Sequence, residues 1–371
     1  MTETKSTFTE WEREENTFKE LQEEVVKTGK CCSCGACIAY CESQNFNVIE
    51  MDGSVPRFKS KESINNCTQC SVCYYICPQT DKLMDALIEN HHVFDDLGYM
   101  KDVIPAKTTN KAFEEVGQDG GIATAILAHL FDRHQIDAAI VSEYDEELKP
   151  IPKIIYNKED LIKSAGTRYS ISSQILPLKD LYNISSDIIK KNRIFDIDEL
   201  KLAFIGSPCQ CRAISKMKLL SVKPAHVIKY VISLFCFENF DYDKLYDILE
   251  KETGVSRLDI KKSWIKKNFF ILTKDDEEFE IDIKKLDNAV RGHCLSCKDF
   301  TGMFSDLSVG AAGAPPNHTM IVIRNETGQK IINSMYSKGL IEQYINPEDR
   351  KRDWKSRKMN WFKRLIEIKQ S

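Results

Sequence analysis

Apolar residues follow two different spacings along the chain. From Ile122 to Phe131 they recur at every third or fourth position, which predicts an amphipathic helix. Short apolar runs with the length and β-branched content of strands follow this helix. The predicted strands are residues 136–141, 202–205, 227–235 and 320–323. Helices that alternate with strands predict an α/β domain with a mixed sheet.

The chain before residue 101 has a different pattern. Residues 1–30 are polar and rich in glutamate, which predicts a helical extension with a solvated acidic face. Alternation around Phe46, Val48 and Ile49 predicts a short hairpin within residues 45–63. Residues 101–111 read as a linker to the larger domain. The predicted class is therefore α+β, in four parts: 1–30, the extension; 31–100, a cysteine-rich domain; 101–345, the α/β domain; and 346–371, a basic tail.

The tail combines lysine and arginine with aromatic and aliphatic residues. Trp354, Trp361, Phe362, Leu365 and Ile366 are interleaved with these cations. The pattern fits an exposed terminal helix. It equally fits a helix that docks on a partner subunit or an acidic surface. Contact with an anionic membrane surface is a third option, although the apolar face is short.

Composition narrows the functional classes. The chain has 371 residues and a formal net charge of −4, so nucleic acid is not the expected partner. No apolar window is long enough to span a bilayer, and the N-terminus lacks the apolar core of a signal peptide. The 14 cysteines are clustered, unlike those of a disulfide scaffold. We expect a cytoplasmic location, either free or at the periphery of a membrane complex.

Eight cysteines form two copies of the spacing Cys-x2-Cys-x2-Cys-x3-Cys. They are Cys31, Cys34, Cys37 and Cys41, then Cys67, Cys70, Cys73 and Cys77. This is the bacterial ferredoxin spacing, in which the fourth cysteine of each run ligates the other cluster. Zinc knuckles lack the final Cys-x3-Cys, and a disulfide framework would require a secreted chain. The runs predict a ferredoxin-like domain with two [4Fe-4S] clusters, and Cys32 competes with Cys31 as first ligand.

Four further cysteines could form another thiolate site. They are Cys209, Cys236, Cys294 and Cys297. The last two form a Cys-x2-Cys pair, and the first two lie at the ends of predicted strands, where ligands gather in α/β sheets. The site would suit a third [4Fe-4S] cluster or a structural zinc. Two alternatives remain: Cys211 could replace Cys209, and Cys236 could be a small buried hydrophobe.

Two segments could bind an organic cofactor. No Gly-x-Gly-x-x-Gly follows a strand, so the sequence does not predict a Rossmann site. Residues 117–121 place three glycines before the helix that starts near Ile122, where free N–H groups favour a phosphate. The alternative is an ordinary loop with Asp119 as the N-cap. Residues 164–170 offer hydroxyls, a guanidinium and an aromatic ring, which suit a nucleotide or an ordinary loop.

The order of these segments resembles the family of beta subunits of coenzyme F420 hydrogenases and dehydrogenases. The matching stretches are Gln118-Asp-Gly-Gly-Ile-Ala-Thr124, Ser164-Ala-Gly-Thr-Arg-Tyr169, Gly206-Ser-Pro-Cys-Gln210, Phe235-Cys-Phe-Glu-Asn-Phe240 and Cys294-Leu-Ser-Cys-Lys-Asp-Phe300, with further similarity from Ser308 to Arg324. The resemblance covers roughly residues 31–330. The doubled ferredoxin segment is most similar to the F420H2-oxidising input subunit of respiratory complexes and to the beta subunits of F420-linked formate dehydrogenases. Two departures are Glu42, where proline is usual, and the loop 314–318 before the final strand.

The resemblance implies two groups in the α/β domain. One is a [4Fe-4S] cluster, the third of the chain, held by Cys209, Cys236, Cys294 and Cys297. The other is FAD, bound without a Rossmann motif. The implied flavin-site residues are Gln118, Gly120, Gly121, Thr124, Ser164, Gly166, Thr167, Arg168, Tyr169 and Ser207. Direct hydride transfer needs no acid or base, so no catalytic side chain is nominated.

The family implies hydride exchange between coenzyme F420 and FAD, with single electrons passing through the clusters. The implied partners are redox subunits of the hydrogenase, formate dehydrogenase, heterodisulfide reductase or membrane F420H2 dehydrogenase type. F420 has an acidic tail, for which Arg168 and Lys163 are candidates, although a surface salt bridge explains them equally well. Two alternatives are a ferredoxin-dependent flavin reductase of another organic substrate and a non-catalytic electron-transfer subunit.

Overall fold

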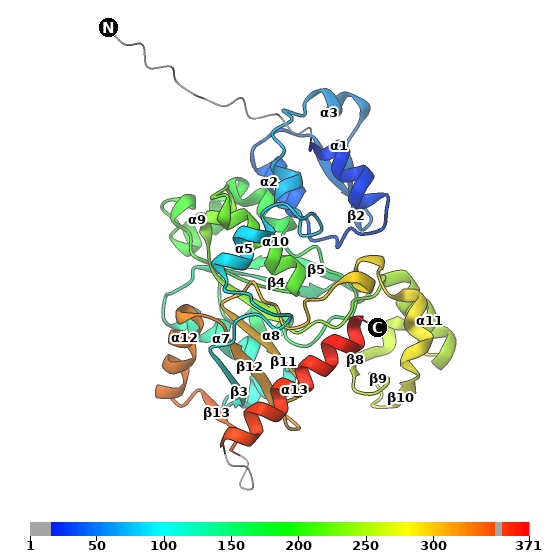
Figure 1. The fold of residues 1–371 in the computed structure, drawn as a ribbon, viewed down its shortest axis with the longest axis vertical. Helices are drawn as coiled ribbons and strands as arrows, with labels where there is room; N and C mark the ends of the chain where they lie inside the picture. The colour runs from blue at the N-terminus through cyan, green and yellow to red at the C-terminus, as the bar shows by residue number, and fades with distance from the viewer. Residues whose placement is uncertain (1–15, 346–350, 371) are drawn as a thin grey trace.

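The computed structural model describes residues 16–345 and 351–370, and it has the cysteine-rich segment at one end (Figure 1). Residues 1–15 of the predicted extension and residues 346–350 and 371 of the predicted tail lie outside the described residues. The larger part of the molecule is a sheet with helices on both faces. A smaller sheet lies beside it.

The cysteine-rich domain consists of short elements around its cysteine loops. They are α1 (Phe18–Leu21), η1 (Gln22–Val26), α2 (Ala36–Ser43), β1 (Ile49–Asp52), β2 (Val55–Phe58), α3 (Lys61–Asn65), α4 (Val72–Tyr75) and α5 (Met84–Asn90). β1 and β2 pair antiparallel, which confirms the predicted hairpin. The predicted extension is packed into this domain, because Phe18, Leu21 and Val25 are buried in its core.

The larger domain is built on a mixed sheet that has eight strands in the described part of the chain. They are β3 (Asp102–Thr108), β4 (Ala138–Tyr144), β5 (Pro150–Ile155), β6 (Leu202–Gly206), β7 (Ile228–Leu234), β11 (Leu307–Gly310), β12 (Thr319–Ile323) and β13 (Ile341–Gln343). Their order is β13-β3-β12-β11-β7-β6-β4-β5. The four strands β11, β7, β6 and β4 run parallel, and the outer pairs are antiparallel. The mixed sheet predicted from the sequence is confirmed.

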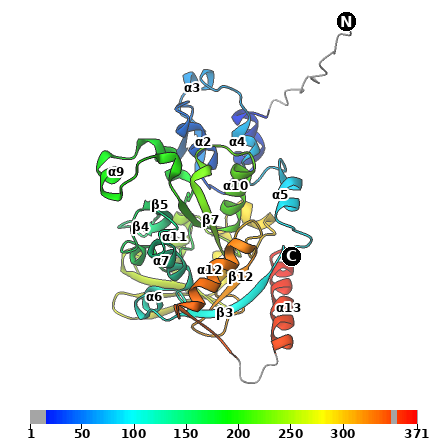
Figure 2. The ribbon, with the colours of Figure 1, turned by 90° about the vertical axis from the view of Figure 1, so that its left-hand side faces the viewer.

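Helices cover both faces of the sheet (Figure 2). α7 (Ile122–Asp132) and α12 (Glu326–Ser337) pack on one face. On the other face, α10 (Pro208–Leu219) and the 3-10 segment η2 (Leu176–Asn183) cover β4, β6 and β7, while α13 (Lys351–Gln370) covers β3 and β12. Smaller helices are α6 (Lys111–Val116), α8 (Leu161–Ser164), α9 (Ser186–Asn192), η3 (Ile197–Glu199) and η4 (Ala225–Val227). None of the helices in residues 16–345 and 351–370 has the length and apolar content to cross a membrane.

Side chains in the central strands alternate between the two helix layers. Ile140 of β4 and Phe204 of β6 pack toward α10, whereas Val141 and Ala203 pack toward α7. Because both faces are buried, these strands read as continuous apolar runs in the sequence. The predicted strands 136–141, 202–205, 227–235 and 320–323 accordingly correspond to β4, β6, β7 and β12.

A second, antiparallel sheet has the order β10-β9-β8. Its strands are β8 (Ile260–Ile265), β9 (Phe269–Thr273) and β10 (Glu278–Ile281), and α11 (Tyr242–Thr253), η5 (Arg257–Asp259), η6 (Ile283–Ala289) and η7 (Gly292–Ser296) flank it. Leu245 and Leu249 of α11 pack on Ile271 of β9. The sequence pattern does not predict this sheet, because lysine and glutamate interrupt its apolar positions.

The linker predicted at residues 101–111 is wrong. Most of it is β3, which lies inside the large sheet between β12 and β13. Val103, Ile104 and Ala106 are buried there. Pro105 has no N–H, but its carbonyl accepts a hydrogen bond from the Tyr344 N–H at 2.8 Å. A proline beside charged residues hides this strand from sequence patterns.

Candidate functional site

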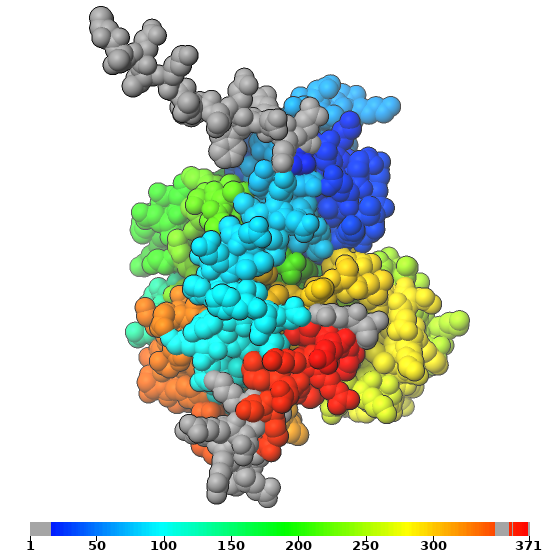
Figure 3. Space-filling model, in the orientation of Figure 1, coloured from blue at the N-terminus to red at the C-terminus, as the bar shows by residue number. Residues whose placement is uncertain are grey.

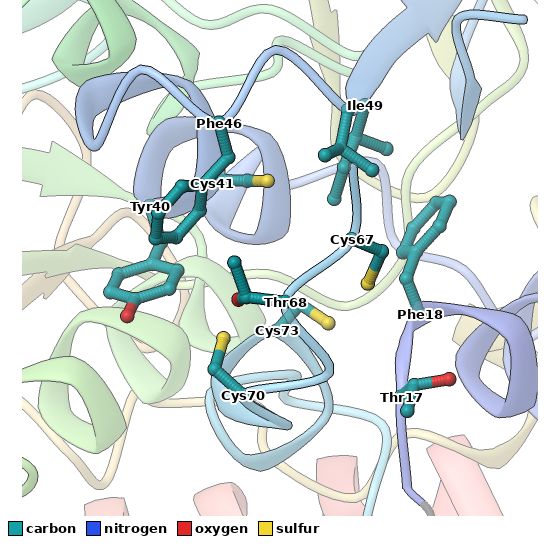
Figure 4. A pocket seen from close by; sticks show the side chains of 11 residues that line it. Thr17, Phe18, Tyr40, Cys41, Phe46, Ile49, Cys67, Thr68, Cys70 and Cys73 are labelled. Atoms are coloured by element: carbon teal, nitrogen blue, oxygen red, sulfur yellow. The ribbon is translucent and has the colours of Figure 1, made fainter. Parts of the chain in front are cut away.

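Eight thiols of the cysteine-rich domain surround two cavities. One cavity is lined by Cys41, Cys67, Cys70 and Cys73, and we call these four cysteines the outer thiol group (Figure 4). The other cavity is lined by Cys31, Cys34, Cys37 and Cys77, and we call these four the inner thiol group. Cys32 also lines this second cavity. In each group, three cysteines come from one run and the fourth comes from the other. This crossed arrangement is the one expected of the bacterial ferredoxin spacing.

α2 contributes side chains to both cavities. It begins after Gly35, which has a φ of 84°. Cys37 in its first turn faces the inner cavity, and Cys41 one turn later lines the outer cavity. Gly35 is also required sterically, because a Cβ there would lie 2.9 Å from the backbone nitrogen of Leu176 in η2. The same turn therefore forms the cysteine loop and its contact with the larger domain.

The two thiol groups differ in exposure. Cys70 of the outer group is exposed and Cys67 is half-buried, whereas Cys34 and Cys37 of the inner group are buried. The outer cavity is lined by apolar side chains such as Phe18, and Figure 4 shows the four sulfurs on different sides of it. The outer group thus lies nearer solvent, and the inner group lies against the rest of the protein.

The donor set fits iron–sulfur clusters. Burial raises the pKa of Cys41 and of Cys77 to about 12, so these thiols become thiolates only where metal stabilises the charge. Both cavities present sulfur donors in apolar surroundings, which suits soft ligation of iron. Among the described residues, no three His, Cys, Asp or Glu side chains converge on a position for a single metal ion. The four thiols of each group instead surround a volume.

A third thiol group lies at the carboxyl ends of β6 and β7. Its members are Cys209, Cys236, Cys294 and Cys297. Cys209 is in the first turn of α10 directly after β6, and Cys236 follows β7. Burial raises the pKa of Cys236 well above its usual value, and the thiols of the other three members raise it further. The structure thus brings together the four cysteines named from the sequence.

Polar groups hold the sulfurs of the third thiol group in position. The Asn239 N–H donates to Cys294 Sγ at 3.3 Å, and His293 Nε2 lies 3.4 Å from the same sulfur. Ser207 Oγ lies 3.2 Å from Cys209 Sγ. Ser207 is predicted as a flavin contact, but this hydrogen bond makes it a neighbour of the thiol group. Such outer contacts orient metal ligands and tune their charge.

The competing cysteines have separate positions. Cys211 is fully buried, and its sulfur lies 3.7 Å from the carbonyl oxygen of Gly206 and 3.7 Å from that of Ile232. Cys31 lines the inner cavity and accepts a hydrogen bond from the Ser33 N–H at 3.4 Å. Cys32 lies close enough to Cys209 for each thiol to act on the pKa of the other. Cys32 thus connects the inner and third thiol groups.

α13 packs beside the third thiol group. Phe362 and Ile366 are buried in a cluster with Phe300, and the red helix lies against the cyan segment before β3 in Figure 3. Lys369 Nζ donates to the Cys236 carbonyl at 3.0 Å. The apolar side of the predicted tail is therefore occupied within the chain, while Trp361 remains partly exposed. The Trp354 side chain lies outside the described residues.

α10 joins the third thiol group to the inner one. Arg212 donates to the Pro78 carbonyl at 3.3 Å and lies 3.9 Å from the Asp299 carboxylate. Lys216 is fully buried, and its Nζ donates to the carbonyls of Cys77 and Thr80 at 2.7 Å each. Burial lowers the pKa of Lys216 to about 8. No sequence pattern indicates this role, because a lysine in an amphipathic helix normally faces solvent.

The glycine segment before α7 forms a tight, uncapped turn. Gly121 is the N-cap of α7, has a φ of 64° and provides no side-chain cap, so the alternative with Asp119 as N-cap is wrong. A Cβ at Gly120 would lie 2.7 Å from the Ala106 carbonyl oxygen, and the Gly120 N–H donates to Thr319 Oγ1 at 3.1 Å. The first N–H groups of α7 are therefore left without a side-chain partner, which favours an anion.

Residues 164–169 lie beside this turn. A Cβ at Gly166 would be 3.7 Å from the Val116 carbonyl oxygen, just before Gly117. The Arg168 guanidinium donates to four carbonyls, those of Lys163, Ser164, Ala165 and Gly166, at 2.7–3.1 Å. It thereby closes the end of α8. Tyr169 Oη accepts from the Ile265 N–H at 3.0 Å. Both side chains shape this segment, a role that adjacency in sequence does not reveal.

The remaining flavin-site predictions fall on or near these two segments. Thr124 is buried in the first turn of α7, and Gln118 is half-buried in the glycine turn. The carbonyl of Thr167 accepts from the Tyr144 hydroxyl at 3.4 Å. The Tyr169 carbonyl accepts from the Phe240 N–H at 2.9 Å, which ties the segment to the loop that follows Cys236. The candidate cofactor segments and the third thiol group are therefore adjacent.

Comparison with known proteins gives consistent matches. Residues 103–179 match the model for the N-terminal part of the coenzyme F420 hydrogenase/dehydrogenase beta subunit, and residues 199–348 match the model for its C terminus. An uncharacterized protein of Methanocaldococcus jannaschii is 32% identical, covering 88% of this chain and 92% of that protein. A component of the F420H2 dehydrogenase of Methanosarcina mazei is 30% identical, covering 83% of this chain and 82% of that protein.

Two further similarities extend the comparison. The coenzyme F420-dependent sulfite reductase of M. jannaschii is 28% identical over 93% of this chain, which spans only 51% of that protein. Among solved structures, a chain of the F420-reducing [NiFe] hydrogenase complex from Methanosarcina barkeri superposes with a TM-score of 0.64 and 26% identity. That match covers 74% of this chain and 90% of the other.

Proposed function

Because the chain belongs to the family of coenzyme F420 hydrogenase/dehydrogenase beta subunits, we propose that it exchanges a hydride between coenzyme F420 and FAD and passes single electrons through [4Fe-4S] clusters to or from a partner redox subunit. The chain is an oxidoreductase, as are the named relatives. FAD, when bound, accepts a hydride and releases electrons one at a time.

One observation carries this proposal: three thiol groups follow one another from the exposed end of the molecule to the candidate cofactor segments. The outer group contains the exposed Cys70, and the inner group shares α2 with it. Cys32 and α10 connect the inner group to the third group. The third group adjoins the loop that pairs with Tyr169. Such an order supports electron movement between a buried hydride site and a partner at the outer group.

The chain's own residues would hold each group. The twelve cysteines of the three thiol groups would ligate three clusters. The uncapped α7 turn, with the close backbone approach at Gly120, would bind the phosphates of FAD. Residues 164–169 would form the adjoining wall of the site, because the Arg168 side chain holds their carbonyls in place. Arg168 is thus engaged with the backbone, which leaves Lys163 as the candidate for the acidic tail of F420.

The decisive experiment mixes anaerobically reconstituted full-length protein with F420H2 and a one-electron dye. We expect oxidised F420 to appear in step with two equivalents of reduced dye, while NADH gives no reaction. Bound flavin without F420H2 oxidation would contradict the proposal and favour the ferredoxin-dependent flavin reductase. Protein that carries clusters but no flavin would favour the non-catalytic electron-transfer subunit.

The Gly121→Ala substitution should lower the affinity for FAD by about tenfold or more. The added methyl group would displace the turn whose N–H groups are proposed to bind the phosphates, and a small displacement of such groups weakens binding strongly. A Cβ at residue 121 would lie 2.6 Å from the Phe113 carbonyl oxygen, so backbone must move. Flavin retained per chain and titration of the apoprotein with FAD measure the effect. Gly254→Ala is the matched control, since Gly254 has a similar φ of 73° but no atom within 4 Å of its Cβ position. Equal flavin affinity in both variants would contradict the assignment.

A further inference from the structure

Lys216 is a buried cation in the joint between the two domains. Its side chain has no exposed surface, and its ammonium group contacts the carbonyls of Cys77 and Thr80. Cys77 is a member of the inner thiol group, and Thr80 lies three residues further along the same loop. Lys216 therefore reaches from the larger domain into the loop that completes the inner thiol group.

The face of α10 that carries Lys216 also carries Arg212 and Cys209. Cys209, Arg212 and Lys216 are spaced by three and four residues, so they lie on one side of the helix. Cys209 belongs to the third thiol group, and Arg212 contacts the Pro78 carbonyl directly after Cys77. One helix face therefore spans the distance between two thiol groups and carries two cations along the way.

The charge of Lys216 has no carboxylate partner among the described residues: both of its hydrogen-bond acceptors are backbone carbonyls. Arg212 differs, because it faces Asp299 at 3.9 Å. Other charges that act on Lys216 are the thiols of Cys77 and Cys34, the carboxylate of Asp81 and the like charge of Arg212. An ammonium group buried without a counter-ion costs several kcal/mol, so a compensating negative charge nearby is expected.

A loaded inner thiol group would supply that charge. Four thiolates outweigh the positive charge of the iron–sulfur core, and one-electron reduction adds a further negative charge. A fixed cation beside the cluster favours the reduced state, because it lowers the energy of the added electron. Carbonyl oxygens hold the ammonium group in place, so its position does not depend on a flexible ion pair.

We propose that Lys216 is the counter-cation of the inner cluster and raises its reduction potential relative to that of the same cluster without the cation. The inference rests on the proposed function, in which Cys31, Cys34, Cys37 and Cys77 hold a cluster. Lys216 is a positioning residue, since it touches the loop of a ligand and not the reacting substrate. Its effect should be larger on the inner cluster than on the third one, because its ammonium group contacts the Cys77 carbonyl.

The test is a potentiometric titration of full-length, cluster-loaded protein followed by electron paramagnetic resonance. The signal of the inner cluster is assigned by its loss in the Cys34→Ser variant. We expect Lys216→Gln to lower the equilibrium constant for reduction of this cluster about tenfold, which corresponds to about 59 mV for one electron. Lys216→Arg keeps the charge and should stay near the wild type. Lys218→Gln, an exposed lysine on the same helix, is the matched control and should have no effect.

The variants separate the charge from its hydrogen bonds. Glutamine can still donate to one carbonyl, whereas Lys216→Met removes both charge and donors. A shift in Lys216→Met but not in Lys216→Gln would show that the lysine only anchors the loop, which overturns the inference. Loss of inner-cluster iron in both neutral variants but not in Lys216→Arg would support it, whereas loss in all three would overturn it. Wild-type protein that loads no inner cluster would overturn the proposed function as well.

Discussion

Under the proposed function, replacing Cys294 with serine should abolish electron transfer from F420H2 to the cysteine-rich domain while leaving the flavin bound. Serine is a poor iron ligand, so we expect bound iron to fall from about twelve to about eight atoms per chain. F420H2 should still reduce the flavin, because the candidate cofactor segments are built from other residues. The cluster signals expected of the cysteine-rich domain should then no longer appear after F420H2 is added, although dithionite still produces them.

Cys211→Ser is the matched control for this experiment. Cys211 is in the same helix as Cys209, but its sulfur contacts the carbonyls of Gly206 and Ile232. A serine hydroxyl can bond to the same carbonyls, so iron content and electron transfer should match the wild type. Wild-type iron content in Cys294→Ser would show that the third thiol group holds no cluster. Intact electron transfer after loss of the third cluster would show that this cluster is not on the path.

Replacing Arg324 with methionine should lower the free energy of unfolding by about 3–5 kcal/mol. Arg324 is 4% exposed, and its guanidinium donates to Ser308 Oγ, to Thr301 Oγ1 and to the carbonyls of Leu97, Tyr99 and Thr301 at 2.7–3.1 Å. The substitution leaves the buried carbonyls of Leu97 and Thr301 without these donors, and each unsatisfied buried group costs about 1–3 kcal/mol. Urea titration followed by circular dichroism measures the change.

Lysine should not restore this stability, because one ammonium group cannot reproduce the planar set of five donors. Arg257→Met is the control. Arg257 bonds to Glu250 and Asp247 near the surface, and we expect its loss to cost about 1 kcal/mol or less. Comparing the two variants shows whether the loss of stability depends on the burial of the arginine or on the number of its hydrogen bonds. Arg324 connects the segment that contains Leu97 and Tyr99 to the sheet. A decrease of less than about 1 kcal/mol in the free energy of unfolding of Arg324→Met would contradict this role.

Much of the candidate site could be predicted because cysteine spacing and strand ends are local signals. Cys209 and Cys236 could be named because each follows an apolar run, and the sheet places the ends of parallel neighbours together. The spacing also predicts that Cys41 and Cys77, the fourth cysteines of the two runs, each join the three cysteines of the other run. Local patterns specify which residues share a loop or an edge, and these sites use that kind of proximity.

Other features depend on contacts between distant segments, which one sequence does not reveal. Lys216 and Arg324 are buried cations, and each donates to carbonyls that lie more than a hundred residues away in sequence. Arg168 looked like a ligand for an acidic group, but its donors close a helix end in its own segment. β3 was hidden by Pro105, since a strand between two others is not expected to contain proline. In each case tertiary contacts override the local preference of the residue type.

The contact between the domains has a consequence for rates. Cys34, Ala36 and Ile76 of the cysteine-rich domain share one hydrophobic core with Phe204 and Ile214 of the sheet domain. The two domains therefore share a continuous packed interior, unlike an electron-carrier domain that moves on a flexible linker. Internal electron transfer would then be independent of solvent viscosity and of protein concentration. Its speed would depend on the fixed separation of the clusters and on driving force, and only the encounter with an outside partner would be diffusive.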